Sequence, residues 1–277
     1  MNKFYNIPSD AKRRIYVATG EKSKLPPYAI EKDWWVVQTL FILFELEIGT
    51  HLVFKGGTSL SKVWNMIERF SEDIDLAVDR SFFGYEGYLG KSKRTKLRKD
   101  SNSYIRETLY PALKKAIISM LDNEFPNLPF SQEFILVPTV LPERTFLEKI
   151  FLLHEEFQRP KEKMRIDRLS RHLYDIYQIS NTEFANKALK SRELYETIVK
   201  HRKSFTKLGG VDYNLHQPQS INFIPPKEII SHWENDYKLM QEQMIYGNTP
   251  EFDELIDSLK ELKSKINNMK WKMDLNF

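Results

Sequence analysis

The stretch that decides the fold reads FKGGTS at residues 54–59 and DID at residues 73–75. An apolar segment leads into the paired glycines, and after a helix-like stretch the chain returns through Ile-Asp-Leu-Ala-Val at residues 74–78. In a strand, alternate side chains point to the same face. We therefore expect Asp73 and Asp75 to share one face, while the opposite face is buried and carries Ile74, Leu76 and Val78.

Two carboxylates beside a glycine-rich turn are the groups that metal-assisted phosphoryl transfer requires. Carboxylate oxygens hold Mg²⁺, and two such ions about 3.5–4 Å apart can activate an attacking oxygen and neutralise a leaving pyrophosphate. Gly56 and Gly57 would let backbone N–H groups approach a triphosphate at a helix N-terminus. Thr58 or Ser59 could donate its hydroxyl to a phosphate oxygen, although capping the helix is the plainer role for either residue.

Four ordered motifs resemble those of the AbiEii/AbiGii nucleotidyltransferase toxins, which are members of the polymerase-beta-like superfamily. The motifs are IEKDWW at residues 30–35, GGTSLSK at 56–62, RFSEDIDL at 69–76 and RTFLEKI at 144–150. An Asp-x-Asp pair alone is common by chance, whereas the ordered set is specific. The resemblance covers roughly residues 28 to 180.

This resemblance implies an α+β fold. Residues 1–143 would form N-terminal helices and a small mixed-sheet polymerase-beta-like nucleotidyltransferase core, and the all-helical residues 144–277 would complete the active site. Lys149 would contact nucleotide phosphates, a task that suits a compact ammonium with three donors. Asp175 would also belong to the site, either as a base that orients the acceptor hydroxyl or in the metal shell. A plain ion pair with Arg171 at i−4 stays the alternative.

Periodicity supplies the remaining elements. Helices are expected at 10–22, 30–48, 60–69 and 93–121 and over most of the chain after residue 143. Strands are expected at 51–55, 73–78 and 134–137. Pro111 would kink or split the helix that contains it. Lys149 lies off the centre of its helix's apolar face, so its amine could reach a cleft or solvent, and Asp175 lies opposite the apolar side of the next helix. His154 is expected in the core.

One feature departs from the polymerase-beta-like pattern. Many enzymes of that superfamily place a third metal-binding carboxylate on a later strand. The acids between residues 113 and 144 are Asp122, Glu124, Glu133 and Glu143. None lies inside an alternating strand. Three explanations stay open: the third acid is dispensable, Asp175 replaces it, or the chain is impaired.

Composition bounds the class of protein. At 277 residues with 41% hydrophobic content, the chain suits one large or two small globular domains. The absence of cysteine excludes disulfides and thiolate metal sites. No apolar run approaches the roughly 20 residues that span a membrane, and the first nine residues are polar, unlike a secretory signal. We therefore expect a cytoplasmic protein with no membrane partner.

The net charge of +4 is modest, but basic residues are clustered. Clusters occur at residues 91–99, 159–171 and 200–203. Such clusters neutralise phosphates and could dock a nucleic acid. A solvated surface offset by acids elsewhere is the alternative for each of them.

The combined prediction is a Mg²⁺-dependent nucleotidyltransferase toxin of a bacterial toxin–antitoxin or phage-defence system. It would transfer NMP from an NTP to an RNA acceptor and release pyrophosphate. By resemblance the acceptor is the 3′ end of tRNA, and the partner is a cognate antitoxin protein. Two alternatives stay open. One is a protein that binds NTP without turnover, and the other is a transferase acting on a protein hydroxyl or a small molecule.

Overall fold

The computed structural model describes residues 4, 6–71, 73–121 and 137–274. The chain divides into two compact units, of which the first is Met1–Ser59 with Phe70–Thr139 and the second is Leu60–Arg69 with Val140–Phe277. The sequence predicts a single division at residue 143 and does not single out the segment Leu60–Arg69. Whether the two parts fold as independent domains stays a prediction.

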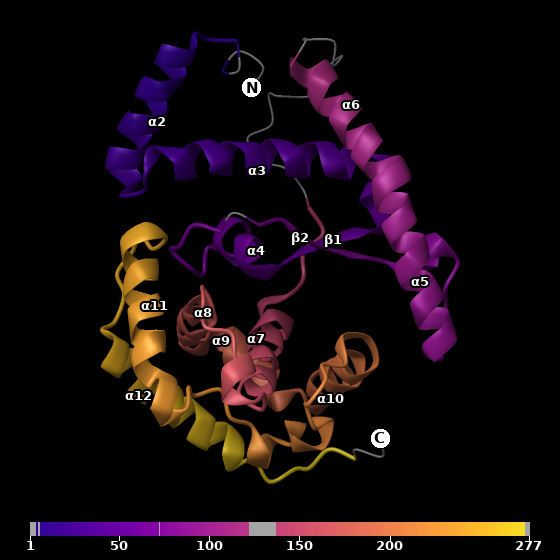
Figure 1. Cartoon of the computed structure of the whole chain (residues 1–277), viewed down its shortest axis with the longest axis vertical. Helices are drawn as coiled ribbons and strands as arrows, with labels where there is room; N and C mark the ends of the chain where they lie inside the picture. Colours follow the sequence, from indigo (N-terminus) through magenta and orange to yellow (C-terminus); the bar gives the residue numbers. More distant parts are fainter. Residues whose placement is uncertain (1–3, 5, 72, 122–136, 275–277) are drawn as a thin grey trace. The chain divides into compact units, whose positions relative to one another are not determined.

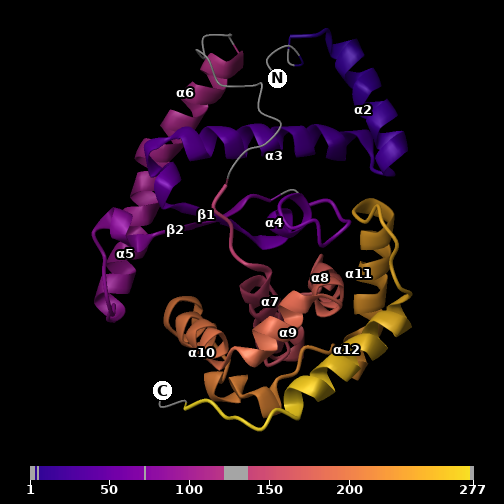
Figure 2. The same cartoon turned by 180° about the vertical axis from the view of Figure 1, so that it is seen from behind.

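The first unit combines helices with a small sheet, and α3 runs along one side of that sheet (Figures 1 and 2). They are α2 (Ser9–Ser23), α3 (Pro27–Glu45), α5 (Lys91–Tyr104) and α6 (Tyr110–Leu121), with short 3-10 turns at Glu47–His51 and Arg80–Phe83. Pro27 opens α3, a position where the missing N–H of proline has no helical partner to lose. Helix α3 contacts both α2 and α6, and both views show α2 near one end of α3 and α6 near the other.

The long helix expected at 93–121 is divided. Between α5 and α6 the chain makes a π-helical turn, Ile105–Leu109, in which the Tyr110 N–H donates to the Ile105 carbonyl. Pro111 follows one residue later and has no N–H to donate. Single π turns of this kind accommodate an interruption of the helical hydrogen-bond ladder. The structure therefore confirms that the helix is interrupted near Pro111.

The sheet places β1 beside two other segments. Strand β1 (Leu52–Lys55) pairs antiparallel with β2 (Asp75–Val78). On β1, Phe54 also forms a parallel bridge with Thr139 and donates its N–H to the Pro138 carbonyl at 2.7 Å. Parallel and antiparallel pairing thus meet at β1, as a mixed sheet requires, but among the described residues only the two-stranded sheet is complete. Residues 134–136 of the third expected strand lie outside the described residues.

Two local expectations around the sheet are wrong. The helix expected at 60–69 is α4 (Gly56–Lys62), which begins at the glycine pair and ends early. Beyond it Asn65 adopts a left-handed φ of 48°, a conformation that terminates helices and that asparagine tolerates. Val78 was expected on the buried face of its strand but is 38% exposed, whereas Ile74 and Leu76 pack against Phe54 as expected.

The described residues of the second unit form helices and loops, with one isolated bridge between Arg69 and Ile245. Its helices after residue 140 are α7 (Pro142–Glu156), α8 (Ser170–Ser180), α9 (Glu183–Lys190), α10 (Arg192–His201), α11 (Ile230–Gln243) and α12 (Phe252–Asn267). Helix α7 contacts α8, α9 and α10, and α8 also contacts α11 and α12. Leu60 of the second sequence motif and Phe146, Leu147 and Ile150 of the fourth belong to the apolar core of this unit. The protein is mostly helical with one small sheet, which agrees with the α+β class.

Candidate active site

The glycine-rich turn of the first unit is built against the Asp75 side chain. Gly56 has a φ of +80°, a region that residues with a Cβ rarely adopt, and a Cβ at this position would overlap the Asp75 carboxylate. Strand pairing sets this proximity, because Lys55 lies opposite Asp75 in the register of β1 and β2. Glycine at position 56 therefore allows the turn to approach the second aspartate of the Asp-x-Asp pair.

The two hydroxyl residues of the turn are buried and hold its backbone. Thr58 Oγ1 donates to the Asp73 carbonyl, and Ser59 Oγ donates to the Gly56 carbonyl at 2.9 Å. The first contact ties the start of α4 to the chain that leads into β2. In this conformation both hydroxyl protons are directed to carbonyl oxygens, so the contacts shown are those of turn and cap residues. Their role as phosphate donors stays a prediction.

Asp73 and Asp75 both have exposed side chains. Asp73 precedes β2 and Asp75 begins it, with the half-buried Ile74 between them. This alternation agrees with the expectation that the two carboxylates share a face. Exposed carboxylates beside a turn fit Mg²⁺, which keeps several waters and is commonly held by one or two carboxylates together with substrate phosphates.

No third ligand joins this pair in the described part of the chain, where no group of three or more His, Cys, Asp or Glu could hold a metal ion. Of the four acids considered from the sequence, Glu143 lies in the first turn of α7. The other three lie outside the described residues: Asp122, Glu124 and Glu133.

A buried ion cluster lies in the second unit. Asp175 on α8 is fully buried, and its two carboxylate oxygens accept from Arg69 Nε and Nη2, each at 2.7 Å. Lys149 on α7 places its Nζ 2.7 Å from Asp175 Oδ2. The structure therefore joins the two site residues that the sequence predicts from the helical half, and it adds Arg69 as a second cation on Asp175.

Both predicted orientations in the helical half are wrong. Lys149 was expected to reach a cleft or solvent, but it is 6% exposed and its amine turns to Asp175. Asp175 was expected on the polar side of its helix, yet it is enclosed. Its bidentate partner is Arg69, 106 residues away in the sequence. A charged partner from another part of the chain can compensate the burial of an acidic side chain that helical periodicity would place on the surface.

The electrostatics of the cluster fix its charge. Burial opposes ionisation, but Arg69 and Lys149 hold the pKa of the Asp175 carboxyl well below its usual range. Burial lowers the pKa of the Lys149 amine, and Asp175 opposes that shift. Burial and the neighbouring Lys149 charge lower the pKa of His172 well below its usual value, so its imidazole is neutral near pH 7. His172 Nδ1 lies 3.4 Å from Lys149 Nζ and can accept from it.

This arrangement favours one of the roles considered for Asp175 over the others. A carboxylate with both oxygens paired to cations and a strongly lowered pKa is a poor proton acceptor and has little capacity left for a metal. It is well suited to position Lys149. With Lys149 protonated, two cations face a single carboxylate in the cluster.

Arg69 is the site residue that sequence reasoning missed. It opens the RFSEDIDL motif, and its side chain is 2% exposed between Ile67 and Phe70, which are also buried. The place of an arginine at the start of a family motif was the available signal. Its partner could not be read from the sequence, because Asp175 lies in a different helix far along the chain.

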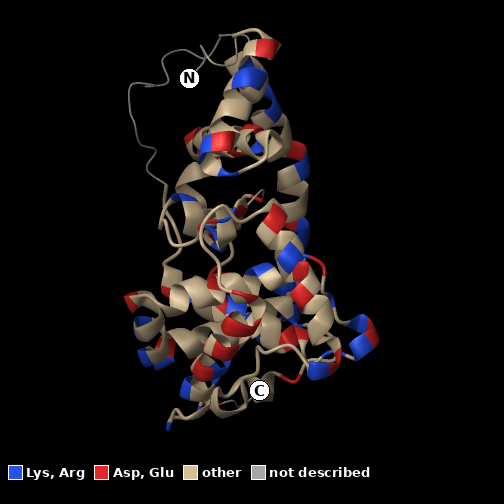
Figure 3. Cartoon of the chain, turned by 90° about the vertical axis from the view of Figure 1, so that its left-hand side faces the viewer, with Lys and Arg blue, Asp and Glu red and all other residues tan. Residues whose placement is uncertain are grey.

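The basic clusters differ in what their side chains do. The cluster at residues 91–99 lies on α5, and most of its basic side chains are exposed. In the second cluster, Arg159 and Arg165 pair with the buried Glu156, and in the third, Arg202 makes a bidentate pair with the buried Glu155. Figure 3 shows acidic positions interspersed with the basic ones along the ribbon. Part of the second and third clusters therefore stabilises the helical core.

His154 is a core residue, as the sequence predicts. It is 4% exposed, and its Nδ1 accepts the Asn222 N–H at 3.0 Å. Burial, with His216 nearby, lowers the pKa of His154 to about 4. The imidazole is thus neutral near pH 7 and serves as a hydrogen-bond acceptor within the apolar helix face.

The site residues described above fall within a match to a known protein family. The family model described as nucleotidyl transferase AbiEii toxin, type IV TA system, matches residues 38–103 and 102–258. These ranges contain the turn, the Asp-x-Asp pair and the buried cluster. Proteins of this kind are nucleotidyl transferase toxins, and the chain belongs to the AbiEii family. The comparison with curated proteins returned no match, and neither did the comparison with solved structures.

Family membership has two direct consequences. It identifies the chain as a nucleotidyl transferase toxin of a type IV toxin–antitoxin system, and it implies an antitoxin partner. Among the described residues, no helix combines the length and apolar character needed to cross a membrane.

Proposed function

We propose that this protein transfers a nucleoside monophosphate from an NTP to an RNA acceptor in a Mg²⁺-dependent reaction. The acceptor hydroxyl oxygen would attack the α-phosphorus, the bond from that phosphorus to the bridging oxygen of the β-phosphate would break, and pyrophosphate would leave. The observation that carries the proposal is the exposed Asp73 and Asp75 pair beside the Gly56 turn, inside the AbiEii match.

The first unit would hold the reacting phosphates. Asp73 and Asp75 are the candidate metal ligands, and bound Mg²⁺ would neutralise charge on the triphosphate and the leaving pyrophosphate. Gly56 and Gly57 would admit the phosphates close to the backbone, since the first N–H groups of a helix have no partner within it. Thr58 and Ser59 would stabilise the turn through their hydrogen bonds to carbonyl oxygens. Bound phosphates would compete with those carbonyls for the hydroxyl protons.

The second unit would supply a positioned cation. Lys149 would contact the nucleotide phosphates as a point charge, and Asp175 and Arg69 would fix its direction. Only three residues separate Arg69 from Asp73 in the sequence, so a short stretch of chain joins the two clusters. The two cations of the buried cluster, which face a single carboxylate, support a role toward an anion. The exposed basic side chains of α5 support a polyanionic acceptor such as tRNA.

The experiment is a transfer assay with total RNA, Mg²⁺ or EDTA, and each NTP labelled on either the α- or the γ-phosphate. We expect label on RNA from one α-labelled NTP, no label from the γ-labelled form, and no transfer in EDTA. Asp73→Ala and Asp75→Ala should abolish transfer. Asp79→Asn is the matched control, because Asp79 is an exposed acid beyond β2 and asparagine can replace it as the cap of Ser81.

The same assay tests the alternatives. Labelled product that resists RNase and remains with protein or a small molecule would identify the acceptor as a protein or a small molecule. Binding of NTP without product from any acceptor would favour the protein that binds without turnover. The lack of a third carboxylate among the described residues and the ion-paired state of Asp175 are the observations behind that second candidate. Absence of both product and NTP binding would overturn the proposal.

A further inference from the structure

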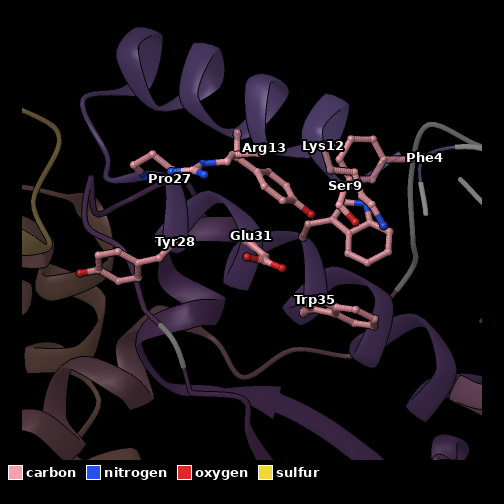
Figure 4. A pocket seen from close by; sticks show the side chains of 10 residues that line it. Phe4, Ser9, Lys12, Arg13, Pro27, Tyr28, Glu31 and Trp35 are labelled. Carbon is pink, nitrogen blue, oxygen red and sulfur yellow. The ribbon is translucent and has the colours of Figure 1, made fainter. Parts of the chain in front are cut away.

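A pocket of about 430 Å³ lies in the first unit, between α2 and α3 (Figure 4). Its lining residues fall between positions 4 and 35, whereas the family match begins at residue 38. The pocket therefore precedes the residues that the family model matches, although Glu31, Trp34 and Trp35 belong to the IEKDWW motif. Its lining includes no residue of the Gly56 turn or of the Asp-x-Asp pair.

Half of the lining residues are aromatic. They are Phe4, Tyr16, Tyr28, Trp34 and Trp35. The rings form a connected wall in which the Phe4 and Trp34 centroids are 5.5 Å apart and the Trp34 and Trp35 centroids are 4.8 Å apart. Tyr28 is 52% exposed at the pocket's edge. The tryptophans pack against neighbouring rings, and they also line the cavity.

Charged groups of both signs enter the same pocket from facing helices. Lys12 and Arg13 come from α2, and Glu31 comes from α3. Figure 4 shows the Glu31 carboxylate between the two helices, with the Arg13 side chain on the facing helix. Burial, together with the Glu31 charge, raises the pKa of Tyr16, which also lines the pocket. The lining thus combines ring faces, one carboxylate acceptor and a surplus of cations.

We propose that this pocket binds a single unstacked nucleotide. The base would stack on the exposed aromatic surface, as unpaired bases do on protein rings. Glu31 would accept hydrogen bonds from N–H groups on the base edge, and guanine suits a carboxylate best because it offers two adjacent N–H donors. Arg13 and Lys12 would bind the phosphate. The nucleotide is either a free nucleoside monophosphate or one residue of a single strand.

An apolar peptide fits this lining less well than a nucleotide does. It would cover the rings but leave Glu31 and Arg13 partly desolvated, and unsatisfied charges of this kind oppose binding. A nucleotide satisfies all three kinds of group at once: the ring faces, the carboxylate and the cations. The chemistry of the lining therefore favours a planar, hydrogen-bonding anion.

The test measures binding in EDTA, where Mg²⁺-dependent binding at the proposed transferase site is suppressed. Calorimetry with each nucleoside 5′-monophosphate and fluorescence anisotropy with labelled homopolymeric pentaribonucleotides distinguish the two sources. Equal affinity for monophosphate and pentamer would indicate a free nucleotide, and tighter binding of the pentamer would indicate a strand. Guanine ligands should bind most tightly.

Three exposed lining residues have matched controls elsewhere in the first unit. Tyr28→Ala, Arg13→Ala and Glu31→Gln should each weaken binding about fivefold or more, by loss of stacking, phosphate contact and base contact respectively. Glu31→Gln should also reduce the preference for guanine. The controls lie outside the pocket and should change affinity less than about twofold by the same reasoning: Tyr88→Ala, Arg14→Ala and Glu21→Gln.

Lack of binding to every nucleotide and pentamer would overturn the inference. Equal effects of the lining variants and their controls would overturn it as well, since the binding would then lie elsewhere. The result does not depend on turnover. A failed transfer assay with intact, Arg13-dependent binding would refute the proposed function and leave the pocket's assignment in place.

Discussion

The carboxylates of Asp73 and Asp75 are exposed beside a glycine turn, whereas that of Asp175 is enclosed and bound by Arg69 and Lys149. An exposed acid can exchange water for a metal ion or phosphate-bound ion at small cost. A buried acid cannot lose its partners without leaving a charge unpaired in a low-dielectric interior. The difference shows that acids of one proposed site can act in different ways. Under the proposed function, the exposed pair would bind the ligand, and the buried acid would direct a neighbouring cation.

Removal of the buried acid should give the largest loss of stability. Asp175→Ala leaves two buried cations without their carboxylate, and breaking a buried pair in this way costs about 3–5 kcal/mol. Asp75→Ala, at an exposed position, should change the free energy of unfolding by less than about 0.5 kcal/mol. Denaturant unfolding of both variants measures the contrast. Similar losses in the two variants would show that burial does not separate their roles.

Substitution of the two cations of the buried cluster should have different effects: loss of Lys149 should lower transfer activity, and loss of Arg69 should lower stability. Lys149→Met leaves Arg69 and Asp175 as a complete bidentate pair, so stability should change little. Loss of a preorganised charge at the reacting phosphates should lower transfer by about 10²–10³-fold. Arg69→Met should instead lower stability, because Asp175 loses its bidentate partner. A Lys149→Met protein with full transfer activity would reduce this lysine to a structural residue.

The free energy of unfolding should depend on pH through the buried His154. The pKa of His154 is about 4 in the folded protein and about 6.5 when unfolded. Between these values the unfolded chain binds the extra proton, so stability falls as the pH decreases from about 6.5 to about 4, by about 3 kcal/mol. His154→Asn removes the titrating group and should flatten this part of the stability profile. Parallel profiles for the variant and the parent would assign the acid sensitivity to other groups.

The exposed half of the site could be predicted more fully than the buried half. Strand alternation and a glycine pair are local patterns, and they predict the turn, the Asp-x-Asp strand and their proximity. The cluster of Arg69, Lys149 and Asp175 depends on a contact across 106 residues, which no local period encodes. Helical periodicity assigned Asp175 to the surface because it ranks side chains by polarity and does not see a buried partner.

A smaller loss of stability than that of Asp175→Ala is expected from a change in the turn itself. Gly56→Ala forces a Cβ into a φ of +80° and against the Asp75 carboxylate. Backbone strain of this kind costs about 1–3 kcal/mol, less than the loss expected for Asp175→Ala. The added Cβ would displace the Asp75 carboxylate, so we expect the transfer rate to fall by more than the loss of stability alone would explain.

Gly84→Ala is the matched control, since Gly84 also has a positive φ, of 72°, but no atom lies within 4 Å of an added Cβ. The control should show the backbone strain without the loss of transfer. If both variants lost transfer equally, the close approach between Gly56 and Asp75 would have no part in the reaction. Loss in Gly56→Ala alone would show that the exposed half, too, depends on a contact that holds its carboxylate in place.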